Sequence, residues 1–190
     1  MPLNIPNLLT WFRIMMIPLI VAVFYFPPQW LSAHEANLVA TLIFGIAAAT
    51  DWLDGYLARM LNQTSAFGAF LDPVADKLMV AAALIVLVEM GRVGAVIALV
   101  IIGREIAISA LREWMATIGA GKSVAVSFLG KVKTTAQMAA ILLLLYHEKV
   151  PQLFDAQVVG TWLIYVAAIL TLWSMGYYLK MAMPQVLKRV

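Results

Sequence analysis

Four aspartates stand in two pairs, Asp51 with Asp54 and Asp72 with Asp76, and we call them the acidic quartet. On a helix the members of each pair share one face, because residues three or four positions apart lie one above the other. Only a short stretch, residues 62–67, separates the two carrying segments. Helices joined by a short connection are usually neighbours. We therefore expect an antiparallel helix pair that brings the four carboxylates together.

Carboxylates gathered in this way need positive charge. Leaving them buried and unpaired is costly and would force protonation. A divalent cation is the natural neutraliser, and a set of oxygen ligands suits Mg²⁺, Mn²⁺ or Ca²⁺ better than zinc. Two ions bridged by shared carboxylates would suit phosphoryl-group chemistry. The quartet is therefore interpreted as a metal site.

Small and basic residues surround the quartet. Gly55 and Ala58 leave the helix face beside Asp54 open, so that a bulky ligand can approach the backbone. Gly68 does the same at the start of the next helix, and Arg59 offers a cation to a phosphate close to the metal. This combination favours a phosphate-containing ligand.

A different interpretation treats the aspartates as helix caps or loop charges. Asp72 precedes Pro73, which is typical of an N-cap followed by proline at the first helical position. A cap does not explain Asp51, Asp54 and Asp76, which are expected inside helices. The metal-site interpretation is therefore preferred.

A second set of charges lies further along the chain. Arg104 and Arg112 are eight residues apart on one helix face, ~12 Å along its axis. With Lys131 and Lys133 they could form a cationic pocket for an acceptor that carries phosphate. The alternative is that Arg104 pairs internally with a carboxylate and that the other cations only flank the membrane or contact lipid headgroups.

Six apolar stretches must position these residues. The sequence is 64% hydrophobic and 12% charged over 190 residues, more apolar than a soluble domain of this size can bury. Each stretch is near the ~20 residues that cross a bilayer. The stretches are residues 8–26, 35–60, 69–90, 93–115, 128–146 and 157–181. The prediction is an all-α integral membrane protein with six transmembrane helices and a single domain over residues 1–190.

Basic residues favour one side of this bundle, and positive charge is retained in the cytoplasm. The side of the N-terminus carries Arg13, Arg59, Arg112, Lys122, Lys131, Lys133, Lys180, Lys188 and Arg189. The other side carries only Arg92 and Lys149. Both termini are therefore expected in the cytoplasm. The modest net charge of +3 gives no reason to expect a nucleic-acid partner.

A cation transporter is the rival from another functional class, because acids within spans can line an ion path. Its acids should lie near mid-membrane in both structural halves. The quartet lies near the cytoplasmic ends of two adjacent spans, beside glycine, alanine and arginine, which favours an enzyme.

The quartet and its neighbours resemble the signature of the CDP-alcohol phosphotransferases, D-x-x-D-G-x-x-A-R, eight residues, then G-x-x-x-D-x-x-x-D, with every fixed position matched over residues 51–76. The resemblance implies a six-helix membrane enzyme that transfers a phosphatidyl or similar group from a CDP-linked donor to an alcohol and releases CMP. It implies two divalent cations on the quartet, Mg²⁺ with Mn²⁺ as the alternative, and Asp76 as general base. The donor-binding residues it implies are Asp51, Asp54, Gly55, Ala58, Arg59, Gly68 and Asp72. Asn7, Thr10 and Arg13 resemble the family's N-terminal motif, which leaves open whether they touch the donor.

Beyond the signature, the chain resembles the bacterial branch of the family that uses glycerol 3-phosphate, notably over residues 4–10, 68–77, 104–106, 109–114 and 130–137. This implies CDP-diacylglycerol as donor and an acceptor phosphate held by Arg104, Arg112, Lys131 and Lys133. It further implies a homodimer among the lipids of the bacterial inner membrane, with the active site facing the cytoplasm. Serine as acceptor would leave the arginines unexplained, whereas charge alone does not separate inositol phosphate from glycerol 3-phosphate.

Overall fold

The computed structural model describes residues 5–60, 66–118, 128–150 and 154–187. The helices are α1 (Ile5–Val23), α2 (Ala33–Met60), α3 (Ala66–Glu89), α4 (Ala95–Thr117), α5 (Phe128–Tyr146) and α6 (Ala156–Leu187). Strands β1 (Lys149–Val150) and β2 (Phe154–Asp155) pair antiparallel between α5 and α6. Each apolar stretch of the sequence is therefore a helix, as predicted.

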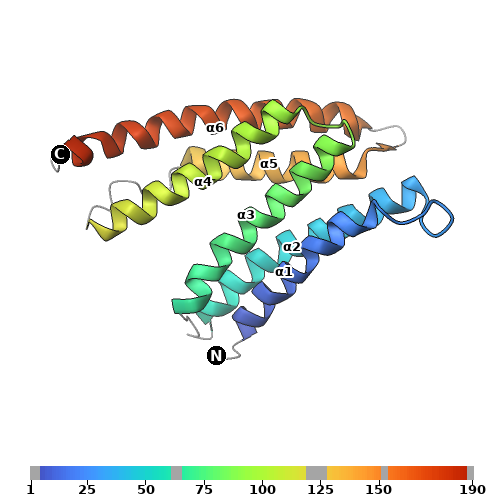
Figure 1. Cartoon of the computed structure of the whole chain (residues 1–190), viewed down its shortest axis with the longest axis horizontal. Helices are drawn as coiled ribbons and strands as arrows, with labels where there is room; N and C mark the ends of the chain where they lie inside the picture. The colour runs from blue at the N-terminus through green and yellow to red at the C-terminus, as the bar shows by residue number, and fades with distance from the viewer. Residues whose placement is uncertain (1–4, 61–65, 119–127, 151–153, 188–190) are drawn as a thin grey trace.

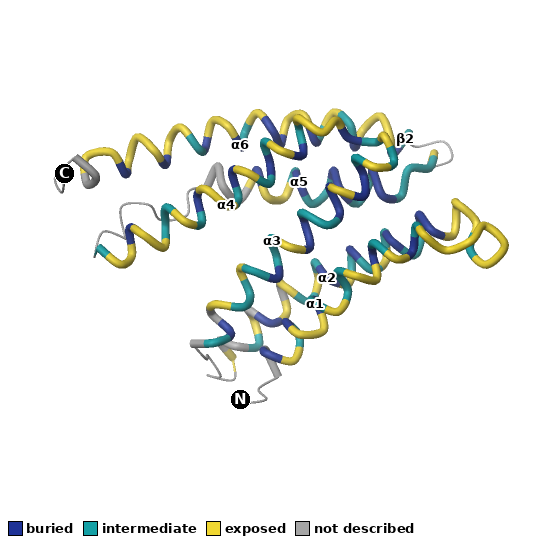
Figure 2. The backbone as a smooth tube through the Cα atoms, viewed as in Figure 1, coloured by how far each residue is buried: buried dark blue, intermediate teal, exposed yellow. Residues whose placement is uncertain are grey.

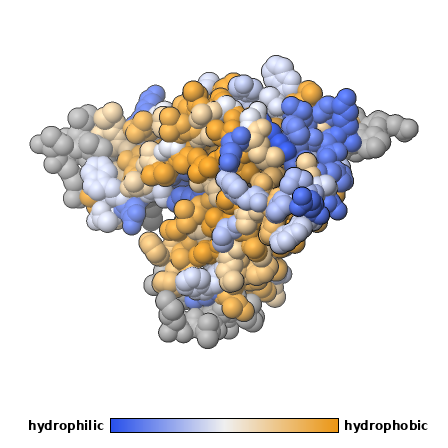
Figure 3. Space-filling model, turned by 45° about the vertical axis from the view of Figure 1, so that its right-hand side comes forward, coloured by the Kyte–Doolittle hydropathy of each residue, from blue (hydrophilic) through white to orange (hydrophobic). Residues whose placement is uncertain are grey.

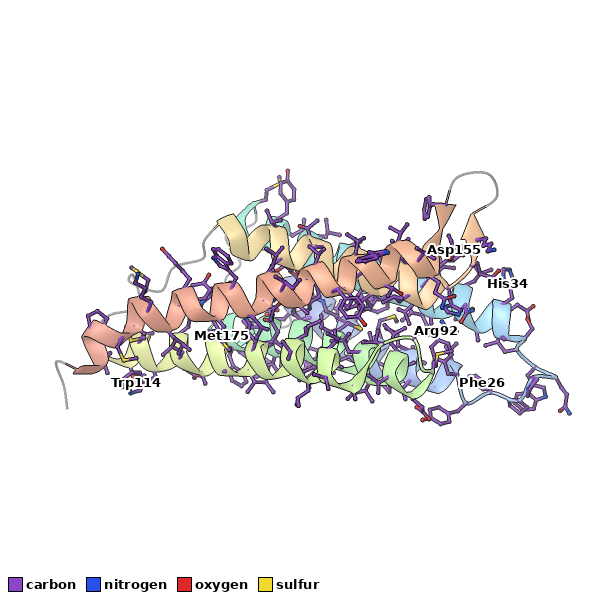
Figure 4. All side chains as sticks on the ribbon, turned by 90° about the horizontal axis from the view of Figure 1, so that it is seen from above. Phe26, His34, Arg92, Trp114, Asp155 and Met175 are labelled. Atoms are coloured by element: carbon purple, nitrogen blue, oxygen red, sulfur yellow. The ribbon has the colours of Figure 1, made fainter. Side chains whose placement is uncertain are left out.

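The helices form two groups that approach each other at one end and diverge at the other (Figure 1). Helices α1, α2 and α3 make up one group, and α4, α5 and α6 make up the other. Both termini lie at the diverging end. Figure 4 shows Phe26, His34, Arg92 and Asp155 together at the opposite end, far from Trp114. We call the diverging end the open end and the opposite end the closed end.

Helices α2 and α3 are in contact, as expected for an antiparallel pair. Helix α1 packs extensively against both, while α2 and α3 touch each other over a much smaller surface. Polar residues on α1 explain this arrangement, because Thr10 and Arg13 are buried, Thr10 contacts Asp72 of α3, and Arg13 contacts two carboxylates of α2. Buried polar contacts therefore link α1 to both α2 and α3.

An apolar core joins the two groups near the closed end, where the buried residues of Figure 2 are densest. Phe44, Leu84, Ile101 and Leu144 are fully buried there. Gly160 lets α6 approach α5 closely, because a Cβ atom at this position would lie 2.9 Å from Leu144 Cγ. The core therefore fixes the two groups to each other where they meet.

Large apolar side chains also cover much of the outer surface, which Figure 3 shows as a broad hydrophobic band. Exposed examples are Leu42, Ile85, Leu99, Trp162 and Trp173. By length and composition, two of the described helical segments can cross a membrane, Ala33–Asp51 of α2 and Ala156–Pro184 of α6. The six-span topology stays a prediction.

The closed end is held by a turn between α3 and α4. Gly91 takes a left-handed conformation with φ +69°, and the amides of Gly91 and Arg92 bond to the carbonyls of Val88 and Leu87 in a Schellman motif. The Arg92 side chain then donates to the carbonyls of Leu144 and Leu145, each at 3.0 Å, and at 2.7 Å to the Asn37 side chain. Arg92 thus ties the end of α5 to α2, and its burial lowers the pKa of its guanidinium.

Replacing Arg92 should loosen the closed end. Arg92→Met removes three hydrogen bonds from a charged donor and should lower the free energy of unfolding by roughly 2 to 4 kcal/mol. Thermal unfolding in detergent measures the loss. Lys149→Met removes a nearby exposed cation and should change little; equal stability of the two variants would contradict the role of Arg92.

Candidate active site

A cavity of about 400 Å³ lies between the two helix groups, toward the open end. Its walls come from α3, α4, α5 and α6. They are Pro73, Asp76, Lys77, Arg104, Glu105, Ile108, Ser109, Arg112, Thr134 and Tyr178. The structure thus places the predicted general base, Asp76, in one cavity with two of the predicted phosphate-binding residues, Arg104 and Arg112.

The acidic quartet is engaged by α1. Arg13 is 1% exposed and donates to Asp51 Oδ1 at 2.6 Å and to Asp54 Oδ2 at 2.5 Å. Thr10 donates a hydrogen bond to Asp72. The sequence grouped Arg13 with the cationic membrane flank, yet its guanidinium is the buried partner of two quartet carboxylates. Its place in the family's N-terminal motif was the signal that pointed to the site.

Three of the four carboxylates, those of Asp51, Asp54 and Asp72, are contacted by polar residues of α1. No group of three or more aspartate, glutamate or histidine side chains within the described ranges is close enough to hold a metal ion. The convergence of all four carboxylates on metal stays a prediction. Asp51 still lies near enough to Asp76 to interact with it electrostatically. The ligand chemistry of Asp51 and Asp54 fits a divalent cation. The two carboxylates offer only oxygen ligands, and they already share one positive group, the Arg13 guanidinium.

Asp72 and Pro73 lie within α3, which begins at Ala66. The cap interpretation of Asp72 is therefore wrong. Gly68 is buried near the start of the same helix. The side chains of Gly55, Ala58, Arg59 and Lys131, which the sequence assigned to donor or acceptor, lie outside the described residues.

A second charged cluster centres on Glu105. Lys133 is 2% exposed and forms an ion pair with Glu105, whose Oε1 also lies 3.4 Å from Arg104 Nη1. The internal carboxylate pairing considered for Arg104 thus occurs, and the same carboxylate holds Lys133. Arg104 also donates to Ser174 Oγ at 2.9 Å. The predicted acceptor cations are therefore held in place by neighbouring polar groups.

Three cavity residues escaped the sequence analysis. Lys77 on α3 donates to Ser109 on α4 at 2.5 Å and bridges the two helix groups. Glu105 contacts Arg104, and Tyr178 contacts both Arg104 and Arg112. Lys77 directly follows Asp76, and Glu105 directly follows Arg104. Their positions next to predicted site residues could therefore have pointed to them. No sequence signal pointed to Tyr178, because it resembles the aromatic residues that flank membrane helices.

Comparison with known proteins places these features in one family. The sequence model of the CDP-alcohol phosphatidyltransferases matches residues 3–173. The chain belongs to this family. Its members generally use divalent cations.

Bacterial relatives match almost the entire chain. A protein of Salmonella choleraesuis is 53% identical over 184 residues, 96% of each chain. Proteins of Shigella flexneri serotype 5b and Escherichia coli K12 are 52% and 51% identical, over 98% of this chain and 99% of theirs. All three are named CDP-diacylglycerol–glycerol-3-phosphate 3-phosphatidyltransferase.

Removing the Arg13 charge should destabilise the protein when divalent cations are absent. Arg13→Met leaves the buried Asp54 without its ion-pair partner and should cost about 3 kcal/mol of folding free energy. Thermal unfolding in detergent with a chelator measures this. Arg13→Lys keeps the charge and should lose less, and adding Asp54→Asn to Arg13→Met should recover part of the loss. Wild-type stability of Arg13→Met would disprove the pairing.

Proposed function

We propose that this enzyme transfers the phosphatidyl group of CDP-diacylglycerol to glycerol 3-phosphate, forming phosphatidylglycerophosphate and CMP in anionic phospholipid synthesis. The activity named for the full-length relatives carries this proposal. The cavity supports it, because a carboxylate and two arginines face one space large enough for a small phosphorylated alcohol. Inositol phosphate would satisfy the same charges, so the acceptor assignment depends on the relatives.

The donor diphosphate is assigned to the acidic quartet. Asp51, Asp54, Asp72 and Asp76 would hold two divalent cations, Mg²⁺ with Mn²⁺ as the alternative. When bound, these ions neutralise the diphosphate and the charge on departing CMP. The rest of the signature, Gly55, Ala58, Arg59 and Gly68, would line the space for the CDP moiety.

The acceptor is assigned to the α4–α6 side of the cavity. Arg104 and Arg112 would hold its phosphate, with Lys131 and Lys133 adding positive charge. Asp76 would take the proton from the free primary hydroxyl, whose oxygen then attacks the phosphorus that bears diacylglycerol. The bond from that phosphorus to the CMP oxygen breaks, and CMP leaves. Asp76 suits this step because it lines the cavity with Arg104 and Arg112 and also interacts electrostatically with Asp51 of the quartet.

The membrane arrangement remains part of the proposal. Residues 1–190 would form one domain with six spans in the bacterial inner membrane, with both termini and the open end in the cytoplasm, and would act as a homodimer. The outer apolar band supports lipid contact, and both termini lie at the open end (Figures 1 and 3). This orientation would let a water-soluble acceptor enter from the cytoplasm.

Turnover in detergent tests the reaction directly. Purified protein with Mg²⁺, CDP-diacylglycerol and labelled glycerol 3-phosphate should release CMP and form a labelled lipid, and EDTA should stop the reaction until Mg²⁺ is restored. Parallel reactions with serine and inositol phosphate serve as controls. Turnover with either of these, but none with glycerol 3-phosphate, would overturn the acceptor assignment.

Asp76→Asn tests the proposed base. It removes the proton acceptor and should lower kcat roughly a thousandfold, while CDP-diacylglycerol binding is largely kept. Asp155→Asn is the matched control, because Asp155 lies at the closed end and accepts hydrogen bonds from backbone amides at the start of α6. Asp155→Asn should keep normal turnover. Normal turnover of Asp76→Asn would reject Asp76 as the base.

A further inference from the structure

Both cavity arginines lie against one aromatic ring. The guanidinium carbons of Arg104 and Arg112 are 5.6 Å and 4.9 Å from the centroid of the Tyr178 ring. The Tyr178 hydroxyl also accepts a hydrogen bond from Arg112 Nη2 at 2.9 Å. Tyr178 is 1% exposed, so its side chain is fixed by packing. One residue of α6 therefore contacts both guanidinium groups of α4.

A polar stripe on α6 continues this support. Thr171, Ser174 and Tyr178 are three and four positions apart, share one helix face, and are each at most 1% exposed. Ser174 donates to the Thr171 carbonyl at 3.0 Å and accepts from Arg104 at 2.9 Å. The buried face of α6 is thus built to receive the arginines of α4.

The two guanidinium groups retain unused donors. The Nε atoms of both Arg104 and Arg112 are buried and have no hydrogen-bond acceptor among the described residues. Buried donors without partners are costly, and both residues line the cavity. A phosphate bound there would meet the parts of the two guanidinium groups that face the cavity. The arginines are therefore held in place while part of their bonding capacity stays available.

Two like charges in a partly buried site repel each other, and long arginine side chains lose entropy when they are ordered. The electron-rich face of an aromatic ring attracts cations, and a phenolic oxygen can fix the direction of one guanidinium plane. Orienting both groups before the acceptor arrives lowers the cost of binding it. Tyr178 supplies both effects.

We propose that Tyr178 is a positioning residue that orients Arg104 and Arg112 to clamp the phosphate of the acceptor. Its ring acts on both arginines, and its hydroxyl acts on Arg112. This inference rests on the proposed function, because it requires a phosphorylated acceptor at the arginine pair. It assigns to α6 a part in acceptor recognition, through the arginines and without direct contact with the reacting atoms.

A purely packing role for Tyr178 must be distinguished, because the residue also belongs to an apolar cluster with Ile108, Met115 and Ala182. Tyr178→Phe keeps the ring and its volume but removes the hydroxyl. It should raise the KM for glycerol 3-phosphate about tenfold, the effect expected from losing a hydrogen bond to a charged group. The KM for CDP-diacylglycerol, kcat and the melting temperature should stay near wild type. Tyr178→Leu also removes the ring and should raise the acceptor KM further.

Tyr177→Phe is the matched control. Tyr177 is the adjacent residue, is 45% exposed, and meets Tyr178 edge to face, a contact that its phenylalanine variant keeps. This variant should behave as wild type. An unchanged acceptor KM in Tyr178→Phe would overturn the proposal, as would equal increases in both substrate KM values.

A double-mutant cycle tests whether Tyr178 acts through Arg112. In an Arg112→Lys background, Tyr178→Phe should add little to the acceptor KM, because the oriented guanidinium is already lost. Full additivity would overturn the proposed coupling. If the wild type uses inositol phosphate instead of glycerol 3-phosphate, the proposed function fails, and the same measurements with inositol phosphate still decide the role of Tyr178.

Discussion

The arrangement of the first three helices depends on the compensation of buried negative charge. Asp54 is 3% exposed, and a carboxylate at that depth needs a partner. Arg13 provides it from α1 and also reaches Asp51, while Thr10 bonds Asp72. These contacts explain why α1 packs against both α2 and α3. The same carboxylates are those proposed to hold the cations that bind the donor diphosphate. The helix packing and the proposed chemistry therefore both need positive charge at this site.

In the second helix group the buried charge is positive, and a carboxylate and polar groups compensate it. Cations of α4 and α5 are buried there, and Glu105 sits between Arg104 and Lys133 while residues of α6 receive the arginines. In the proposed reaction, the α1–α3 group would hold the donor and the α4–α6 group would hold the acceptor phosphate. Asp76 faces the cavity between them, which is where a proton acceptor must stand if the two substrates meet there.

The closed end lets these two groups remain separate at the open end. The apolar core and the bonds of Arg92 fix the groups together on one side, and the cavity lies toward the other side. Lys77 and Ser109 form a direct polar bridge within the cavity walls. A soluble acceptor and a lipid donor have different origins, and in the proposed reaction the cavity between the two helix groups would receive the acceptor.

The sequence by itself determined the helices and the chemical character of the site. Six apolar stretches predicted six helices, since the length and polarity of each stretch are local properties, and the spacing of the quartet with Gly55 and Arg59 identified the family. The tertiary structure decided the partners. Arg13 against Asp51 and Asp54, Glu105 between two cations, and Tyr178 beneath two arginines all depend on which helix faces meet. Large apolar side chains lie on the outer surface as well as in the core, so the hydrophobic pattern does not mark which face of each helix is buried and could not assign these contacts.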